Sequence, residues 1–140
     1  MNEQEIRQAL ATLEMYKAQA ESLAEQQQIV SFSMEEYSRA RDTLGKWKDA
    51  EKGSELLVPV GGNSFVFAKV ADNKKALVGI GSGVTVERPL EEAIKTLETR
   101  IKELAEASKK LTESLTMLEA RSSQLTQLVQ AEYERLQKQG

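Results

Sequence analysis

A leucine at every seventh position marks the second half of this 140-residue chain. The leucines are Leu90, Leu97, Leu104, Leu111, Leu118 and Leu125. Ile94, Ile101, Ser108, Leu115, Ser122 and Val129 each follow one of them by four residues, and Leu136 follows Glu132 in the same 4,3 spacing. An apolar repeat of seven residues forms one stripe along a helix, the seam, which packs against a second helix in a left-handed coiled coil. The second half is therefore predicted to be one long helix that needs a partner.

The first part of the chain carries a seam of similar length. Its members are Ile6, Ala9, Leu13, Tyr16, Ala20, Leu23, Val30, Met34, Tyr37 and Leu44, and only Gln27 and Arg41 interrupt it. Polar residues at such positions weaken packing and usually select register or partner. Because an insert joins the two helices, the simplest geometry is an antiparallel hairpin in which the free ends of both helices meet.

The first helix is expected within residues 1–53. Asn2 followed by Glu5 resembles a capping box, in which each side chain bonds the backbone N–H of the other residue. Gly53 favours the end of the helix, and Gly45 is a weak point at which the helix can end or bend earlier. The second helix is expected over residues 89–140, with proline as its first residue.

The insert, residues 54–88, changes to a β pattern. Four short apolar runs, 56–60, 64–70, 76–80 and 84–87, are separated by glycine-rich or polar turns, which predicts two successive β-hairpins. The glycines at 79, 81 and 83 precede a strand and not a helix, so they indicate a tight turn and not a phosphate-binding loop. Isolated hairpins are marginally stable and have open edges, so we expect them to pair with strands of other subunits.

Composition narrows the possible functions. The chain has neither cysteine nor histidine, which removes disulfides, thiol nucleophiles, imidazole bases and the usual zinc sites. A net charge of -3 does not indicate the basic surface that nucleic-acid binding requires, and no apolar run is long enough to cross a membrane. We therefore expect a cytoplasmic protein without cofactor or metal, and no enzyme. A serine–lysine site is the catalytic alternative that this composition leaves open.

Phe32 is an apolar side chain that the seam does not use. In the heptad frame of the first helix it lies opposite the seam, so the partner helix does not bury it. An exposed aromatic side chain at such a position predicts contact with another subunit or with a bound chain.

The layout is similar to a known family. The strand Leu56-Leu57-Val58-Pro59-Val60, the segment Val78-Gly79-Ile80-Gly81-Ser82-Gly83-Val84, and Val86-Glu87 before the second long helix resemble the α-class subunit of archaeal prefoldin over the whole chain. The resemblance implies a hexamer of two α and four β-class subunits. In that hexamer, hairpins form a double β-barrel platform and coiled coils extend from it.

The implied fold class is α+β, a long antiparallel α-helical coiled-coil hairpin joined by two β-hairpins that form part of an oligomeric β-barrel platform. The implied function is an ATP-independent chaperone, or holdase, that captures non-native polypeptides at the coiled-coil tips and delivers them to a group II chaperonin. A structural coiled-coil scaffold or filament subunit with the same fold is the alternative.

Two sets of residues follow as candidate sites. The client-binding tip consists of Ile6, Leu10, Leu13, Leu125, Leu128, Val129, Tyr133 and Leu136, near the free helix ends. The oligomerisation surface consists of Leu57, Val58, Val60, Phe65, Phe67, Val78, Ile80, Val84 and Val86. The expected partners are β-class prefoldin subunits, non-native proteins and a group II chaperonin, with no nucleic acid and no membrane.

Overall fold

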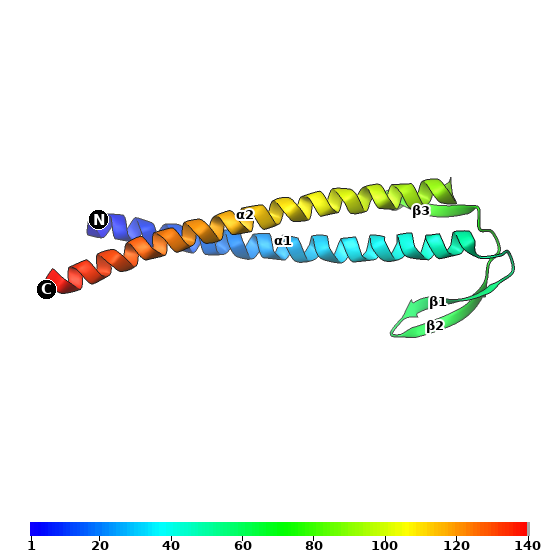
Figure 1. Ribbon diagram of the computed structural model, residues 1–140, viewed down its shortest axis with the longest axis horizontal. Coiled ribbons are helices and arrows are strands. Elements are labelled where there is room, and N and C mark those ends of the chain that lie inside the picture. Colours follow the sequence, from blue (N-terminus) through cyan, green and yellow to red (C-terminus); the bar gives the residue numbers. More distant parts are fainter. Residues whose placement is uncertain (140) are drawn as a thin grey trace. The chain divides into compact units, whose positions relative to one another are not determined.

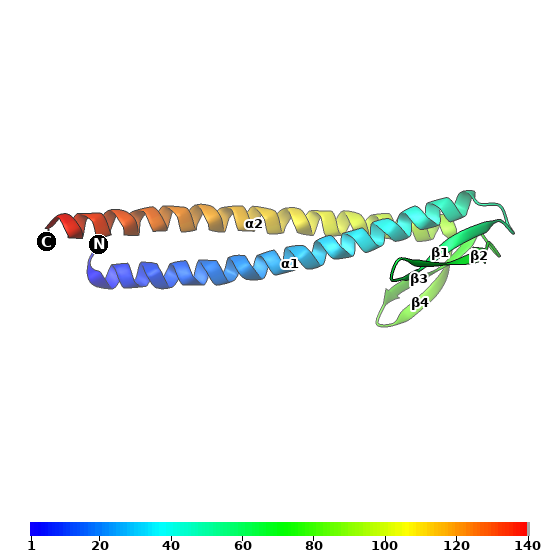
Figure 2. The same ribbon diagram turned by 90° about the horizontal axis from the view of Figure 1, so that it is seen from below.

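A computed structural model describes residues 1–139 of the chain. The elements in order are α1 (Glu3–Asp49), β1 (Glu55–Gly61), β2 (Ser64–Lys69), β3 (Lys75–Gly81), β4 (Val84–Pro89) and α2 (Leu90–Gln139) (Figure 1; β4 is labelled in Figure 2). Two long helices and two antiparallel hairpins confirm the predicted α+β class. None of the helices in the described range is apolar over a length sufficient to span a bilayer.

The chain divides into two compact units. The first combines residues 1–32 with residues 104–139, and the second comprises residues 33–103. In the first unit the two helices are antiparallel, so that both chain ends lie at the same end of the unit in both ribbon views (Figure 2). The predicted meeting of the free helix ends is confirmed.

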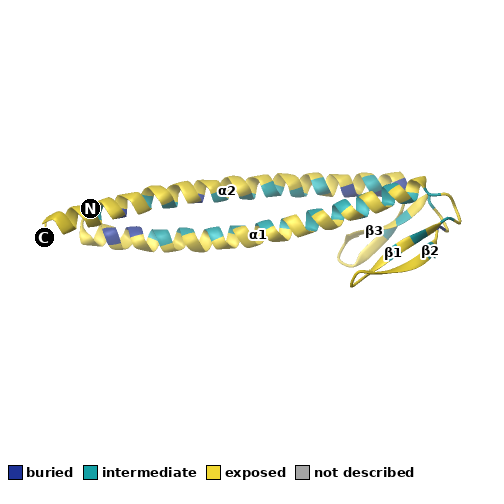
Figure 3. Cartoon of the chain, turned by 60° about the horizontal axis from the view of Figure 1, so that its bottom comes forward, coloured by how far each residue is buried: buried dark blue, intermediate teal, exposed yellow. Residues whose placement is uncertain are grey.

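Burial along the helices of the first unit follows the predicted heptad frame. Ile6, Ala9, Leu118 and Val129 are buried, and the other seam positions from Leu13 to Val30 and from Leu104 to Leu125 are half-buried. Figure 3 shows buried and half-buried residues on the facing sides of the helices and exposed residues elsewhere. The frame places Phe32 outside the seam, and its side chain is 59% exposed.

The seam ends earlier than the leucine repeat predicts. Leu136 is 45% exposed, whereas Glu132, one position earlier in the 4,3 spacing, is half-buried and binds the N-terminal amine of Met1 at 3.2 Å. Because α1 begins only at Glu3, α2 has no helical partner beyond this level. The inclusion of Leu136 in the seam was therefore wrong.

Gln27 forms a polar layer within the seam of the first unit. Its Nε2 donates hydrogen bonds to Ser108 Oγ at 2.8 Å and to Thr112 Oγ1 at 3.2 Å. Its Oε1 is buried, with no hydrogen-bond partner among the described residues. The layer specifies how the helices align, since a shift by one turn would separate Gln27 from both hydroxyls, but it stabilises less than a leucine layer would.

The ends of α1 are set by local hydrogen bonds. Glu5 N donates to Asn2 Oδ1 at 2.8 Å and Asn2 N donates to Glu5 Oε2 at 3.1 Å, which confirms the capping box. The helix continues through Gly45 and ends at Asp49, short of the predicted Gly53. Gly53 has a φ of 88° and its N–H donates to the Val70 carbonyl, so this residue already extends the first hairpin.

In the second unit, two side-chain hydrogen bonds join the end of α1 to the segment between the hairpins. Trp47 Nε1 donates to the Asp72 carbonyl at 2.8 Å, and Asn73 Nδ2 donates to the Ala50 carbonyl at 2.9 Å. Val70, just before this segment, is only 2% exposed. These bonds satisfy backbone groups that a surface turn would otherwise leave to water.

The two hairpins repeat one backbone design with an offset of 20 residues. Val58 pairs with Val66 in the first hairpin as Val78 pairs with Val86 in the second, and the register shifts after Pro59 and after Gly79. In both turns the two central residues have positive φ, Gly62 and Asn63 in one, Ser82 and Gly83 in the other. Such turns match the right-handed twist of the flanking strands.

Pro89 belongs to β4 and not to the second helix. It is the last residue of the strand and pairs with Lys75, and α2 begins at Leu90. The N–H of Leu90 donates to the Lys74 carbonyl at 2.8 Å, which continues the hydrogen bonds of the hairpin into the first helical residue. The strand therefore joins the helix without a linker, and the predicted start of the helix was one residue early.

We predict that the double variant Gln27→Leu/Ser108→Ala is more stable than the parent chain. Removing both polar partners eliminates the buried, unpartnered Oε1 and should raise the free energy of unfolding by about 1 kcal/mol. Thermal unfolding followed by circular dichroism measures the change. Leu111→Ser in the same seam serves as the control and should lower stability by about 2 kcal/mol. A lower melting temperature for the double variant would contradict the prediction.

Candidate interaction surfaces

The eight predicted tip residues separate into three groups by exposure. Ile6 and Val129 are buried at 6% and 5%, and Leu13 and Leu125 are half-buried in the seam. The exposed members are Leu10, Leu128, Tyr133 and Leu136, at 41% to 55%. The structure thus brings all eight to the free ends of the helices but leaves four available to a partner. Ile6 and Val129 pack the two helices together there, so the prediction that they are available to a client was wrong.

Glu132 organises charges at this end of the first unit. Its Oε2 accepts hydrogen bonds from Arg135 Nη2 at 2.9 Å and lies 3.2 Å from the amine of Met1. The Arg135 hydrogen bond, and then the one from the amine, lower the pKa of the Glu132 carboxyl. Because the folded pKa is lowered, the stabilisation is present above the ordinary pKa and is lost as pH falls through the lowered value.

The hairpins turn one face outward. In the first hairpin Leu57 pairs with Phe67 and Pro59 with Phe65, so these four side chains share a face. Leu57 is 55%, Phe65 57% and Phe67 82% exposed. In the second hairpin the matching pairs are Leu77 with Glu87 and Gly79 with Thr85, a more polar face on which Leu77 is 74% exposed. The first hairpin therefore offers the larger apolar surface.

Three predicted oligomerisation residues lie on the opposite face of the hairpins. Val58 and Val86 are half-buried, and Val78 is only 8% exposed. Val78 borders a cavity of about 580 Å³ together with Tyr37, Leu44 and Leu97, all within the second unit. Its role is to pack the hairpin within its own chain, so Val78 was wrongly placed among the contacts to other subunits. Val60, Ile80 and Val84, beside the turns, are 51% to 60% exposed.

Several exposed apolar residues lie outside the two predicted candidate sites. Leu77 and Val66 on the hairpins are 74% and 48% exposed, and Met15, Ile29 and Met117 on the helices are 51% to 67% exposed. In the run Ala-Leu-Val-Gly-Ile nothing polar alternates with the apolar residues, so the outward face of β3 cannot be identified from sequence. The exposure of Met15, Ile29 and Met117 can be predicted from sequence, because each is an apolar residue that lies outside the seam.

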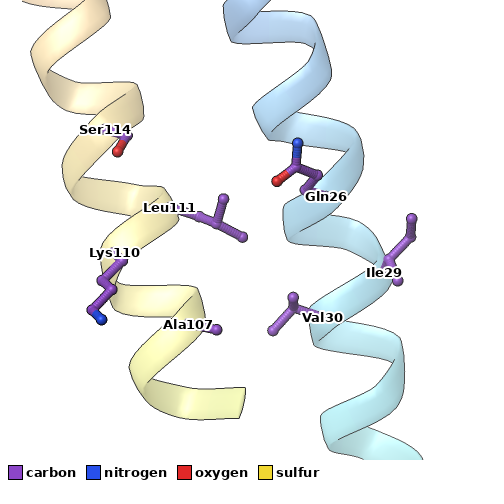
Figure 4. A pocket seen from close by; sticks show the side chains of 7 residues that line it. All are labelled: Gln26, Ile29, Val30, Ala107, Lys110, Leu111 and Ser114. Carbon is purple, nitrogen blue, oxygen red and sulfur yellow. The ribbon is translucent and has the colours of Figure 1, made fainter. Parts of the chain in front are cut away.

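A cavity of about 420 Å³ opens between the helices of the first unit (Figure 4). It is bordered by Gln26, Ile29, Val30, Ala107, Lys110, Leu111 and Ser114. In the close-up, Val30, Ala107 and Leu111 point into the space between the helices, and Ile29 lies at the outer side of α1. The lining is mostly apolar, with the polar and charged groups at its margin.

Comparison with known proteins identifies the family. The family model for the prefoldin subunit matches residues 16–135. Prefoldin subunit alpha of Pyrococcus horikoshii is 36% identical over 130 residues, which cover 92% of this chain and 88% of the relative. Prefoldin subunit alpha of Methanocorpusculum labreanum is 36% identical over 135 residues, 96% of this chain and 92% of the relative.

A solved structure agrees with these relatives. The cryo-EM structure of filamentous PFD from Methanocaldococcus jannaschii superposes with a TM-score of 0.68 at 29% identity, and the match covers 81% of this chain and 94% of that one. The order of the elements, helix–hairpin–hairpin–helix, is consistent with the family match. The chain belongs to the prefoldin subunit family.

Proposed function

We propose that this chain is a subunit of an ATP-independent holdase that captures non-native polypeptides at the free ends of its helices. Prefoldin subunits are chaperone components, and the observation that carries the specific proposal is the exposure of Leu10, Leu128, Tyr133 and Leu136 there. Neighbouring glutamines, such as Gln124 and Gln137, separate these apolar side chains. An apolar surface interrupted by uncharged polar groups suits weak contact with many different unfolded chains.

The outward hairpin faces support assembly with other subunits through a β platform. A two-stranded sheet leaves both of its edges unpaired, and three large apolar side chains of the first hairpin face solvent. We propose that two copies combine with four β-class prefoldin subunits, and that the assembly passes its clients to a group II chaperonin in the cytoplasm.

A filament subunit is the second candidate function. It is favoured by the similarity to a prefoldin structure that is described as filamentous. One interface can produce either assembly. If the rotation between neighbouring subunits brings the last subunit back to the first, a ring forms; otherwise the subunits continue as an open filament. Electron microscopy of the chain alone and mixed with a β-class subunit distinguishes the two, since filaments from the chain alone support this second function.

We predict that Phe67→Asp prevents assembly and leaves the helices folded. A charge at the most exposed apolar position of the hairpins would be desolvated on assembly, at a cost of several kcal/mol. Light scattering of the chain mixed with a β-class subunit measures the mass, and circular dichroism measures the helix content. Val78→Asp is the matched comparison, because it should lower the thermal stability of the chain itself. If the assembly formed with the Phe67 variant has the same mass as that of the parent chain, the assembly proposal is wrong.

We predict that the triple variant Leu10→Ser/Leu128→Ser/Tyr133→Ser holds clients poorly without loss of stability. The three side chains are 41% to 55% exposed, so their loss removes apolar surface for clients but little packing. Suppression of the aggregation of chemically denatured citrate synthase measures holding. Point variants are preferable to truncation, because shortening the helices would also remove the buried Ile6 and Val129. Equal suppression by parent and variant would place the client site elsewhere.

A further inference from the structure

The outer face of α1 carries a second stripe that neither the seam nor the helix ends explain. Its positions alternate by four and three residues from Ala11 to Phe32, as the seam does, and all are exposed. The apolar members are Ala11, Met15, Ala18, Ile29 and Phe32, and Ser22 and Glu25 occupy the remaining positions. The stripe lies within the first unit and is about 32 Å long at the rise of an α-helix.

This spacing suits a helix as the partner. A stripe with alternating steps of four and three residues is the surface that a second helix covers by coiled-coil packing. An extended strand repeats its side chains on one face at about 6.7 Å, which does not match the helical pitch of about 5.4 Å. The large side chains Met15, Ile29 and Phe32 are 51%, 67% and 59% exposed, and the small Ala18 and Ser22 between them permit close approach.

The charges beside the stripe specify the partner further. Glu14 and Glu21 lie along one edge and are exposed, and within residues 1–139 neither forms an ion pair. The opposite edge carries the uncharged Gln19 and Gln26. A helix with basic residues along one flank complements this arrangement. Electrostatic complementarity of this kind selects the partner and the register in which it binds.

The same carboxylates argue against a second copy of this chain as the occupant. In an antiparallel pair the edge with Glu14 and Glu21 would meet the same edge of the other copy, and like charges repel. In a parallel pair it would meet the uncharged edge with Gln19 and Gln26 and gain nothing. Only a partner with a different flank satisfies the acidic edge.

A cavity adjoins the stripe at Ile29. Ile29 belongs both to the stripe and to the border of the 420 Å³ opening between the helices, whose floor includes Val30, Ala107 and Leu111 (Figure 4). A side chain from a docked helix can extend over this open, shallow space and contact its apolar lining. Contact with this lining adds buried apolar area to that of the stripe itself.

We propose that the face of α1 from Ala11 to Phe32 docks an amphipathic α-helix with one basic flank, supplied by a non-native client. This inference rests on the proposed holdase function and adds a substrate class to it. The site selects clients that have already formed helices, whereas the exposed residues at the helix ends accept less ordered segments. It therefore retains partly folded chains whose helices have not yet found their own core.

A synthetic peptide of about 21 residues tests the site, with leucines at steps of four and three and lysines along one flank. Fluorescence anisotropy measures its binding to the full-length chain. One control peptide has two central prolines, which break the helix, and another has glutamates in place of the lysines. The helical basic peptide should bind about tenfold more tightly than either control. Equal affinity for the proline peptide would overturn the proposal.

Variants of the chain assign binding to this face. Ile29→Ser/Phe32→Ser should weaken binding about tenfold, and Glu14→Lys/Glu21→Lys should reverse the preference between basic and acidic peptides. Met117→Ser on α2, with a side chain that is 55% exposed, is the matched control and should change nothing. Phe32→Ser should also leave the melting temperature unchanged, because a drop like that of Leu111→Ser would place the ring in the core and overturn the assignment.

Two further outcomes would also be decisive. If Ile29→Ser/Phe32→Ser lowers the mass of the chain in sedimentation, a second copy occupies the face and the proposal is wrong. Aggregation suppression by the parent chain, measured separately, keeps the two proposals distinct. Intact suppression without peptide binding overturns the helix site alone. Absent suppression with intact peptide binding overturns the holdase function, and with it the non-native client as the source of the helix, although the face of α1 then still binds a basic helix.

Discussion

The strict seven-residue period of the seam is the constraint on which the other surfaces depend. It places the buried positions of each helix on one narrow stripe, so most of the helix circumference stays exposed. Among the described residues only nine apolar side chains are buried, whereas 17 large ones remain exposed. A chain that buries so little of its own apolar surface can cover that surface with partners, which supports the proposed assembly and holding function.

The hairpins use one backbone for two different outward faces. The 20-residue offset preserves the register, the bulge and the turn geometry, and both inward faces carry a pair of valines. Outward, the pair Leu57 and Phe67 corresponds to Leu77 and Glu87. Since the backbones match, the difference lies in side-chain chemistry alone. Two outward faces with the same backbone but different polarity can distinguish between two neighbouring subunits in one assembly.

The seam and the helix start could be predicted from sequence because each depends on local spacing. The reciprocal bonds between Asn2 and Glu5 follow from residues three apart, and the heptad frame follows from periodicity. The side of the hairpin on which Val78 lies could not be predicted, because a continuous apolar run contains no alternation. The exposure of Leu136 depends on where the other helix begins, a property of the pair and not of the repeat. Pro89 was misplaced because proline suits both a strand end and a first helical turn.

The polar layer and the cavity of the first unit lie at neighbouring levels for a physical reason. Gln27 occupies a position that leucine would fill more stably, and it faces the short side chains of Ser108 and Thr112. Ala107 and Ser114, which border the cavity, are also small, so this stretch of α2 supplies little volume next to α1. A seam built for maximal stability would fill the space and close it. Here the packing is sparse, and the hydrogen bonds of Gln27 determine how the helices align. Because these bonds maintain the register, the opening between the helices does not disturb it.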